Sequence, residues 1–260
     1  MPTVTFNKRF RFTIYKYNKM KKSLFFILLF ILTQVNAQKT TVIQDNNAQI
    51  RIMGDFTGVK VSSSIDLYLT QSTSNQVAVS AKDDESRASI VTEVIGGVLF
   101  IKMEDKKGWF YWKGLNDIKA RAYVSIKDMD ALIGSGATNI HLVNKIASPK
   151  LKIKLTGASD LKGELEAATL SINASGASNI ELSGLVDDLS IEVSGASDAK
   201  LYNLITKGAI VHASGASTAN LNVTQLLKAE ASGASSINYK GEPVIRENKS
   251  SGASSIKHKN

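Results

Sequence analysis

One tetrapeptide, Ser-Gly-Ala-Ser, recurs through the second half of the chain and constrains the fold more than any other feature. Seven copies, two of them with Thr in place of one Ser, begin at Ser135, Thr156, Ser175, Ser194, Ser214, Ser232 and Ser251. Their glycines are 21, 19, 19, 20, 18 and 19 residues apart. A fixed motif with a period near 20 is typical of stacked-repeat proteins, in which each unit buries its apolar face only against its neighbours. We therefore expect a solenoid.

The residues on both sides of the motif alternate between apolar and polar. Ile180 follows one copy of the motif and Ile191 precedes the next, and each is followed by a glutamate, Glu181 or Glu192. Other repeats carry the same pattern, and a period of two is that of a β-strand with one buried face. Each repeat is predicted to be a strand, a small-residue corner and a second strand, with both isoleucines buried and both glutamates exposed.

The glycines of the motif are interpreted as structural corner residues, which let the backbone and the neighbouring coil approach closely. If the alternation continues through the motif, the first Ser, the Ala and the fifth residue point outward, and the Gly and the second Ser point inward. The corner glycines are Gly136, Gly157, Gly176, Gly195, Gly215, Gly233 and Gly252.

Several closed geometries have periods near 19 residues. A hexapeptide helix needs strict 18-residue turns and the calcium-binding nonapeptide roll needs Gly-Gly-x-Gly-x-Asp loops, and the sequence has neither pattern. A right-handed parallel β-helix tolerates coils of unequal length, and parallel crossovers are overwhelmingly right-handed. We therefore predict an all-β, right-handed parallel β-helix with about seven coils of 18–21 residues.

Residues 1–37 have the pattern of an export signal. Seven Lys or Arg residues and no acidic residue occur in this range, the apolar run Leu24 to Leu32 follows them, and Val35-Asn36-Ala37 provides small residues for a signal peptidase. The run is about half the roughly 20 residues that a spanning helix needs, so no membrane anchor is expected in the mature chain. Met20 is an alternative start, and a short buried helix is the competing interpretation of the apolar run.

Removal of the signal changes the charge of the chain. The formal net charge of +9 falls to +2, because seven of the 32 basic residues lie in residues 1–37 while all 23 acidic residues remain. Nucleic-acid binding, which needs a basic face, then loses its support. The chain has no cysteine, so neither disulfides nor a lipid-modified N-terminal cysteine are available.

Residues 38–130 contain short β-rich runs but no copy of the motif. Because solenoids need atypical terminal units to cover their open ends, this range is predicted to be an N-terminal cap with the first irregular coils, continuous with the repeat region 131–260. A separate small β-sandwich is the alternative, and no convincing helical periodicity occurs. At the other end, Pro243, Arg246, Asn248 and Ser250 predict a polar last coil.

One stretch, Trp109-Phe110-Tyr111-Trp112, contains both tryptophans of the chain between two predicted strands. Aromatic side chains stack on sugars and anchor protein contacts, so these four residues are candidates for a ligand or partner contact. The competing interpretation is that they cover the open end of the β-helix as part of the cap.

Catalytic and metal sites have little support in the sequence. Stacking predicts that Asp160 and Asp198 lie two coils apart, a separation within reach of the carboxylate pair of an inverting glycosidase, but Asp and Asn at a turn are more often bonded to local backbone. His141, His212 and His258 occupy different phases of the repeat, and no EF-hand, phosphate loop or nucleophile elbow occurs. No catalytic residue, cofactor or metal is therefore assigned.

Residues 55–61, 65–71, 92–94 and 99–102, followed by the serial Ser-Gly-Ala-Ser corners, resemble the auto-transporter adhesin family that carries the head GIN domain. The resemblance covers about residues 48–256 and departs most at the aromatic insertion, residues 106–114. It implies an exported envelope protein of Gram-negative type with a β-helix-like fold, and it implies adhesion as the function.

We therefore predict an exported, non-enzymatic adhesion or scaffolding module in the periplasm, on the outer-membrane surface or secreted. Envelope glycans or surface proteins are its expected partners, and a homo-oligomer is compatible with the sequence. The alternative, from another class, is a polysaccharide-cleaving enzyme on the same scaffold.

Overall fold

The computed structural model describes residues 45–104 and 118–260, and residues 43–260 form one compact unit. Its first half contains short elements: β1 (Gln49–Arg51), β2 (Gly58–Val61), β3 (Asp66–Gln71), β4 (Gln76–Ser80), α2 (Asp84–Ala88), β5 (Ile90–Ile95), β6 (Val98–Met103), β7 (Arg121–Ile126), β8 (Ala131–Gly134) and β9 (Asn139–Leu142). Its second half contains longer strands: β10 (Ile146–Leu155), β11 (Asp160–Ala174), β12 (Asn179–Val193), β13 (Asp198–Ala213), β14 (Thr218–Ala231), β15 (Ser236–Lys240), β16 (Val244–Ser250) and β17 (Ser255–His258).

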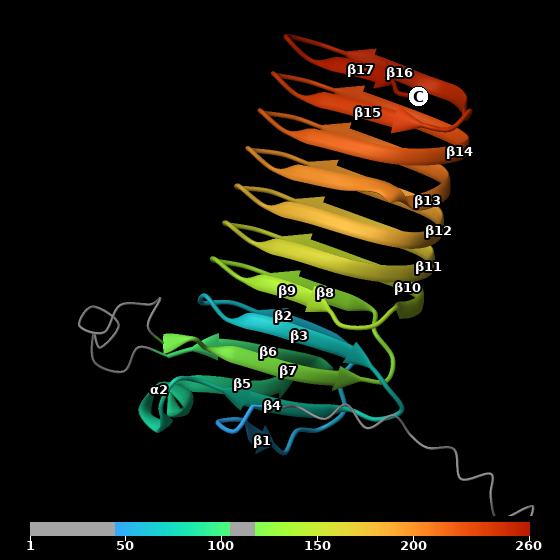
Figure 1. Ribbon diagram of the computed structural model, residues 1–260. Helices are drawn as coiled ribbons and strands as arrows, with labels where there is room; N and C mark the ends of the chain where they lie inside the picture. The colour runs from blue at the N-terminus through green and yellow to red at the C-terminus, as the bar shows by residue number, and fades with distance from the viewer. Residues whose placement is uncertain (1–44, 105–117) are drawn as a thin grey trace, which may run out of the picture. The chain divides into compact units, whose positions relative to one another are not determined.

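The repeat region is a stack of parallel coils. β11 pairs in parallel with β12, β12 with β13, and β13 with β14, so that Ile172 lies beside Ile191 and Ile191 beside Val211. Figure 1 shows the coils one above another, with narrow tips on one side and rounder bends on the other. The predicted all-β parallel solenoid of about seven turns is confirmed.

The strands alternate as the sequence predicts. Ile180 and Ile191 are each 1% exposed, whereas Glu181 and Glu192 lie on the surface. The buried side chains form one hydrophobic core that extends from Phe56 to Ile237. Burial of branched aliphatic side chains along the whole stack supplies the stability that disulfides would otherwise provide.

The narrow tips are the Ser-Gly-Ala-Ser corners, and here one expectation is wrong. The corner glycines are exposed and do not point inward, because strand alternation does not continue through a tight turn. Gly176 has a φ of +81°, and a Cβ on it would lie 2.4 Å from the carbonyl oxygen of Gly157 in the coil before. That oxygen accepts a hydrogen bond of 2.7 Å from the backbone amide of Ala177. The stacking of corners thus leaves no space for a side chain at the glycine position.

The second Ser of the motif does point inward, and it forms a polar column within an otherwise apolar interior. Ser178 is fully buried, and its hydroxyl donates to the carbonyl oxygen of Ser175 at 2.9 Å. Ser217 and Ser235 make the same bond to the first Ser of their own corners, both at 2.8 Å. Because each hydroxyl has a backbone acceptor, its burial carries little penalty.

The first half of the unit continues the stack out of sequence order. β2 lies between β6 and β8, and β3 lies between β7 and β9, all in parallel. β1, β4 and β5 add antiparallel pairings at the outer end of this stack, β1 to β4, β4 to β7 and β5 to β6. The connection from β2 to β3 is a corner without the motif, Ser62-Ser63-Ser64, in line with the repeat corners.

Two further details concern the ends of the unit. Residues 84–88, for which no helical periodicity was found, form the short helix α2, whose N-cap Asp83 accepts a hydrogen bond from the backbone amide of Ser86. At the other end, β16 places the polar residues Arg246, Asn248 and Ser250 on the surface. None of the described residues lies in a helix long and apolar enough to cross a membrane.

Candidate functional site

A column of carboxylates and amides follows the corners along the outer face of the strands. Register places Asp66, Asn139, Asp160, Asn179 and Asp198 beside one another in successive coils. The Asn139 side-chain amide donates to Asp66 at 2.7 Å, and the Asn179 amide donates to Asp160 at 2.8 Å. The column is therefore held by bonds between coils.

This geometry corrects the expected turn bonding of the two acids. The carboxylate of Asp160 is held by an amide of the next coil and not by its own backbone. Asp198 lies two coils from Asp160, as expected from stacking. The two carboxylates are in the same column, on the same face of the sheet. One oxygen of Asp198 is buried without a hydrogen-bond partner, because Asn179 donates to Asp160. A pair of carboxylates on opposite sides of a scissile bond is not formed by these two residues.

A second column lies two residues further along each strand. At one end the rings of Tyr123, Tyr68 and His141 stack at 5.3 and 5.1 Å, and Lys162, Glu181 and Lys200 continue the column. Lys162 forms an ion pair of 3.1 Å with Glu181. Since the ring faces contact one another, the rings offer their edges to solvent and leave little aromatic face for a sugar.

The aromatic end of this column is anchored by Asp45. The Tyr123 hydroxyl donates to Asp45 at 2.8 Å, and Arg121 lies 3.6 Å from the same oxygen. Burial, and then the bond to Asp45, raise the pKa of Tyr123 to about 12. Although burial opposes ionisation of Asp45, hydrogen bonds from Ser80, Tyr123 and the Asn47 backbone hold its pKa below the ordinary value.

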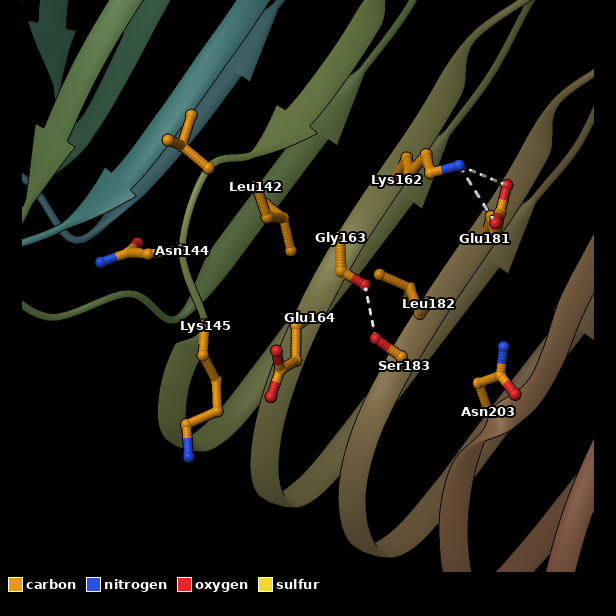
Figure 2. Close-up of a pocket in the computed structure, with 11 residues that line it drawn as sticks. Leu142, Asn144, Lys145, Lys162, Gly163, Glu164, Glu181, Leu182, Ser183 and Asn203 are labelled. Carbon is orange, nitrogen blue, oxygen red and sulfur yellow. Dashed lines mark hydrogen bonds and ion pairs between the residues drawn. The ribbon is translucent and has the colours of Figure 1, made fainter.

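A hollow of about 330 Å³ opens where these columns reach the bend of β11 and β12. Figure 2 shows Leu142 and Leu182 on its floor, the Lys162 and Glu181 pair on one side, and Lys145 and Glu164 on the other. Gly184, with a φ of +119°, shapes the bend, because a Cβ there would lie 1.9 Å from the carbonyl oxygen of Leu165. We call this hollow, with the adjoining polar columns over β9 to β13, the polar groove.

The polar groove is preorganised by short ion pairs. Lys145 lies 2.8 Å from Glu166, and the bond to Glu166 raises the pKa of Lys145. The amide of Asn144 accepts from the backbone of Gln71 and donates back to it, at 2.8 and 2.9 Å. Exposed pairs of this kind add little to stability, but they hold donors and acceptors in place for a polar ligand.

The sequence-derived candidates are distributed differently. The corner glycines occupy the narrow edge of the stack and are absent from the lining of the hollow, and Trp109, Phe110, Tyr111 and Trp112 lie outside the described residues. His141, His212 and His258 are in separate columns, and among the described residues no three His, Asp or Glu side chains gather in a metal-binding arrangement. Strand alternation places Asp160 and Asp198 in one column, but it carries no signal for the hollow of the polar groove, because the bend at Gly184 is not a feature with a period of two.

The fold and the surface define the class of protein: a parallel β-solenoid with a preorganised polar face. A family model described as "Putative auto-transporter adhesin, head GIN domain" matches residues 55–243. The chain belongs to this family, and the resemblance found in its sequence is confirmed. No curated protein matches the chain.

Solved structures share the fold. A protein of Bacteroides fragilis NCTC 9343 described as a "putative adhesin" superimposes with a TM-score of 0.73 at 20% identity, over 82% of this chain and 96% of its own. A "putative lipid binding protein" of Parabacteroides distasonis ATCC 8503 gives 0.63 at 22% identity, over 83% and 98%. A "putative adhesin" of Parabacteroides merdae ATCC 43184 gives 0.60 at 17% identity, over 82% and 95%. At these identities the likeness establishes the fold alone.

Proposed function

We propose that the protein is an exported, non-enzymatic adhesion module of the cell envelope, and that the polar groove is its contact surface for an envelope glycan or a surface protein. The observation that carries the proposal is the set of ordered polar side chains in the groove, fixed by Lys162 with Glu181 and by Lys145 with Glu166. Family membership adds support, because the family's description and two structural neighbours name adhesins.

The chemistry of the groove fits polyhydroxylated or zwitterionic ligands. Lys162, Glu181 and Asn203 present donors and acceptors within one hollow of about 330 Å³, with Leu142 and Leu182 beneath them. Small-molecule sites combine an apolar lining with a few placed polar groups that fix the orientation of the ligand. The described residues provide no specific observation in favour of the polysaccharide-cleaving alternative.

Export is the second part of the proposal and rests on residues 1–37. Cleavage after Ala37 would leave Gln38 as the first residue of the mature protein. The intact mass of protein recovered from the envelope measures this directly, and retention of the leader in that protein would contradict processing at this site.

A glycan array and an envelope pull-down with the protein test the contact surface. The double change Lys162→Ala with Glu181→Ala removes an ion pair of the groove, and we expect at least about a tenfold loss of binding from two such contacts. The matched control is Asn173→Ala with Glu192→Ala, which removes a 2.9 Å bond from another outward column of the same coils. Equal binding by both double variants would contradict the assignment of the groove.

A further inference from the structure

Charge is divided unevenly along the stack. Residues 156–225, which contain β11 to β13, carry three Lys or Arg against eight Asp or Glu, a net charge of −5. Residues 226–260 carry six against three, a net charge of +3. Because the sign of the net charge reverses between adjoining coils, the β16 end of the unit attracts anions and the middle attracts cations.

Apolar side chains are exposed at the same end. Val244 is 58% exposed at the start of β16, and Ile245 beside it is 40% exposed although it is in register with the buried Leu227 of the inward column. Ile210, on the preceding strand β13 and in register with Lys228, is 42% exposed. Register places Val244 directly beside Leu226 of β14. Leu185 on β12 and Ile205 on β13, in register with each other, are 54% and 44% exposed, so exposed aliphatic side chains also occur in the middle of the stack. The positive net charge is what distinguishes the apolar group near β16.

Cations border the apolar group. Lys228 and Arg246 line one surface hollow together with Leu226. The register between β14 and β16 shifts by one residue here, so Arg246 is the extra residue of a β-bulge. Lys228 lies in register with Glu247, which lines the same hollow and whose pKa is lowered by Lys249 and also by Lys228. Arg246 forms no ion pair among residues 45–104 and 118–260. Lys249, in contrast, contacts Glu247 and Glu230, and the bond to Glu247 raises its pKa.

Exposed aliphatic side chains in a region with an excess of cations, here six against three acidic residues, are a combination that holds proteins at an anionic bilayer. The aliphatic groups enter the boundary between headgroups and acyl chains, while Lys and Arg contact lipid phosphates. We infer that the surface formed by Ile210, Leu226, Lys228, Val244, Ile245 and Arg246, here called the end surface, docks on an anionic lipid surface.

A second copy of the chain is a poorer occupant of the end surface. A symmetric contact between two such ends would bring together two regions of charge +3, and like charges oppose that association. An anionic bilayer complements both the charge and the exposed aliphatic groups. The inference does not depend on the proposed adhesive function, because the end surface and the polar groove involve different residues.

Vesicle co-sedimentation tests the inference. We expect protein recovered from the envelope to sediment with phosphatidylcholine vesicles that contain phosphatidylglycerol, to bind pure phosphatidylcholine vesicles at least about tenfold more weakly, and to be released by salt. Lys228→Gln with Arg246→Gln should reduce binding to the anionic vesicles about tenfold or more. Val244→Ser with Ile245→Ser should also weaken it, and the weakening should persist at high salt.

The control is Lys150→Gln with Lys152→Gln, which makes the same charge change on exposed positions of β10, several coils away from β16. All variants keep residues 1–37 unchanged, so any contribution of that segment cancels in the comparison. Equal loss of binding in the control and in the Lys228 and Arg246 variant would overturn the inference, as would equal binding to both kinds of vesicle. Absence of vesicle binding together with a concentration-dependent dimer in light scattering would also overturn it, in favour of a second copy. Thermal melts within a few degrees of the parent show that the variants are folded.

Discussion

Two corners of the stack solve the same geometric problem in different ways. In the repeat region a glycine takes the left-handed position at each tip, as Gly176 does with a φ of +81°. In the β2–β3 coil the tip is Ser62-Ser63-Ser64, and Ser63 and Ser64 take φ values of +68° and +58°. A left-handed conformation costs a non-glycine residue about 1–2 kcal/mol. The comparison teaches that adjacent coils impose the left-handed backbone conformation at each corner, and that the glycine of the motif adopts this conformation with less strain than serine does.

The two regions also differ in what fixes their order. Coils β10 to β14 follow one another in sequence and repeat the same pairings on both sides of the corners, with register shifts confined to the bends of β12 to β14. The coils before β8 rely on individual side chains, such as the Tyr123 ring on Tyr68 and the Tyr123 hydroxyl on Asp45. Substitutions should therefore have different effects in the two regions, except in the core, which is common to both.

The largest effect should come from a charge in that common core. Ile180 and Leu67 occupy the same inward column and are 1% and 0% exposed. Ile180→Asp and Leu67→Asp each bury a carboxylate without a partner, and we expect each to lower the free energy of unfolding by about 4 kcal/mol or more. Urea unfolding measures both, with Glu181→Gln as a control that should stay within about 0.5 kcal/mol. A Leu67→Asp variant that leaves the repeat coils at their original midpoint would show that the two regions have separate cores.

The next effect concerns the corner itself. Gly176→Ala places a Cβ 2.4 Å from the backbone oxygen of Gly157 and forces a left-handed φ on alanine. We expect a loss of about 2–4 kcal/mol, because the obstacle is backbone that neighbouring coils hold in place. Gly54→Ala is the control, since a Cβ there meets nothing within 4 Å. Equal midpoint temperatures of thermal unfolding for the two variants would contradict the stacking of the corners.

A pH-dependent effect distinguishes the N-terminal side of the stack. Tyr123 keeps its proton in the folded state to a pKa of about 12, whereas the unfolded chain releases it near the ordinary tyrosine pKa of 10.0. Stability from this group is therefore fully present below pH 10 and is lost between about pH 10 and 12, by an amount on the order of 1–2 kcal/mol. Tyr123→Phe should reduce the slope of the unfolding free energy against pH between about pH 10 and 12. The same change lowers stability at neutral pH, because it removes the hydrogen bond to Asp45. A slope unchanged by Tyr123→Phe would refute the assignment.

The smallest effect should be a gain. Ser63→Gly relieves a left-handed conformation at the corner that lacks the motif, and the entropy that glycine loses on folding offsets part of the benefit. We expect the free energy of unfolding to rise by at most about 1 kcal/mol. Ser62→Gly, one residue earlier and outside the left-handed pair, should give no gain. If Ser63→Gly destabilised the protein, the serine side chain would have a role beyond the backbone geometry.

The amino-acid sequence by itself determined the repeat, the strand phase and the family. Ile180, Ile191, Glu181 and Glu192 lie on the faces that alternation predicts, because a parallel stack gives every coil the same environment. The inward serines follow from the same alternation, and Ser178 is buried as expected. The glycine orientation was wrong, since a period of two holds only within strands and not through a turn with positive φ.

Only the tertiary structure decided which columns come together at the N-terminal side and where a ligand could lie. β2 is inserted between β6 and β8, so the stack formed by Tyr123, Tyr68 and His141 joins residues far apart in the sequence. The hollow of the polar groove depends on the bend at Gly184, and the end surface depends on a bulge at Arg246. These features arise from pairings between distant segments, and alternation within one segment carries no information about which distant strand will become its neighbour.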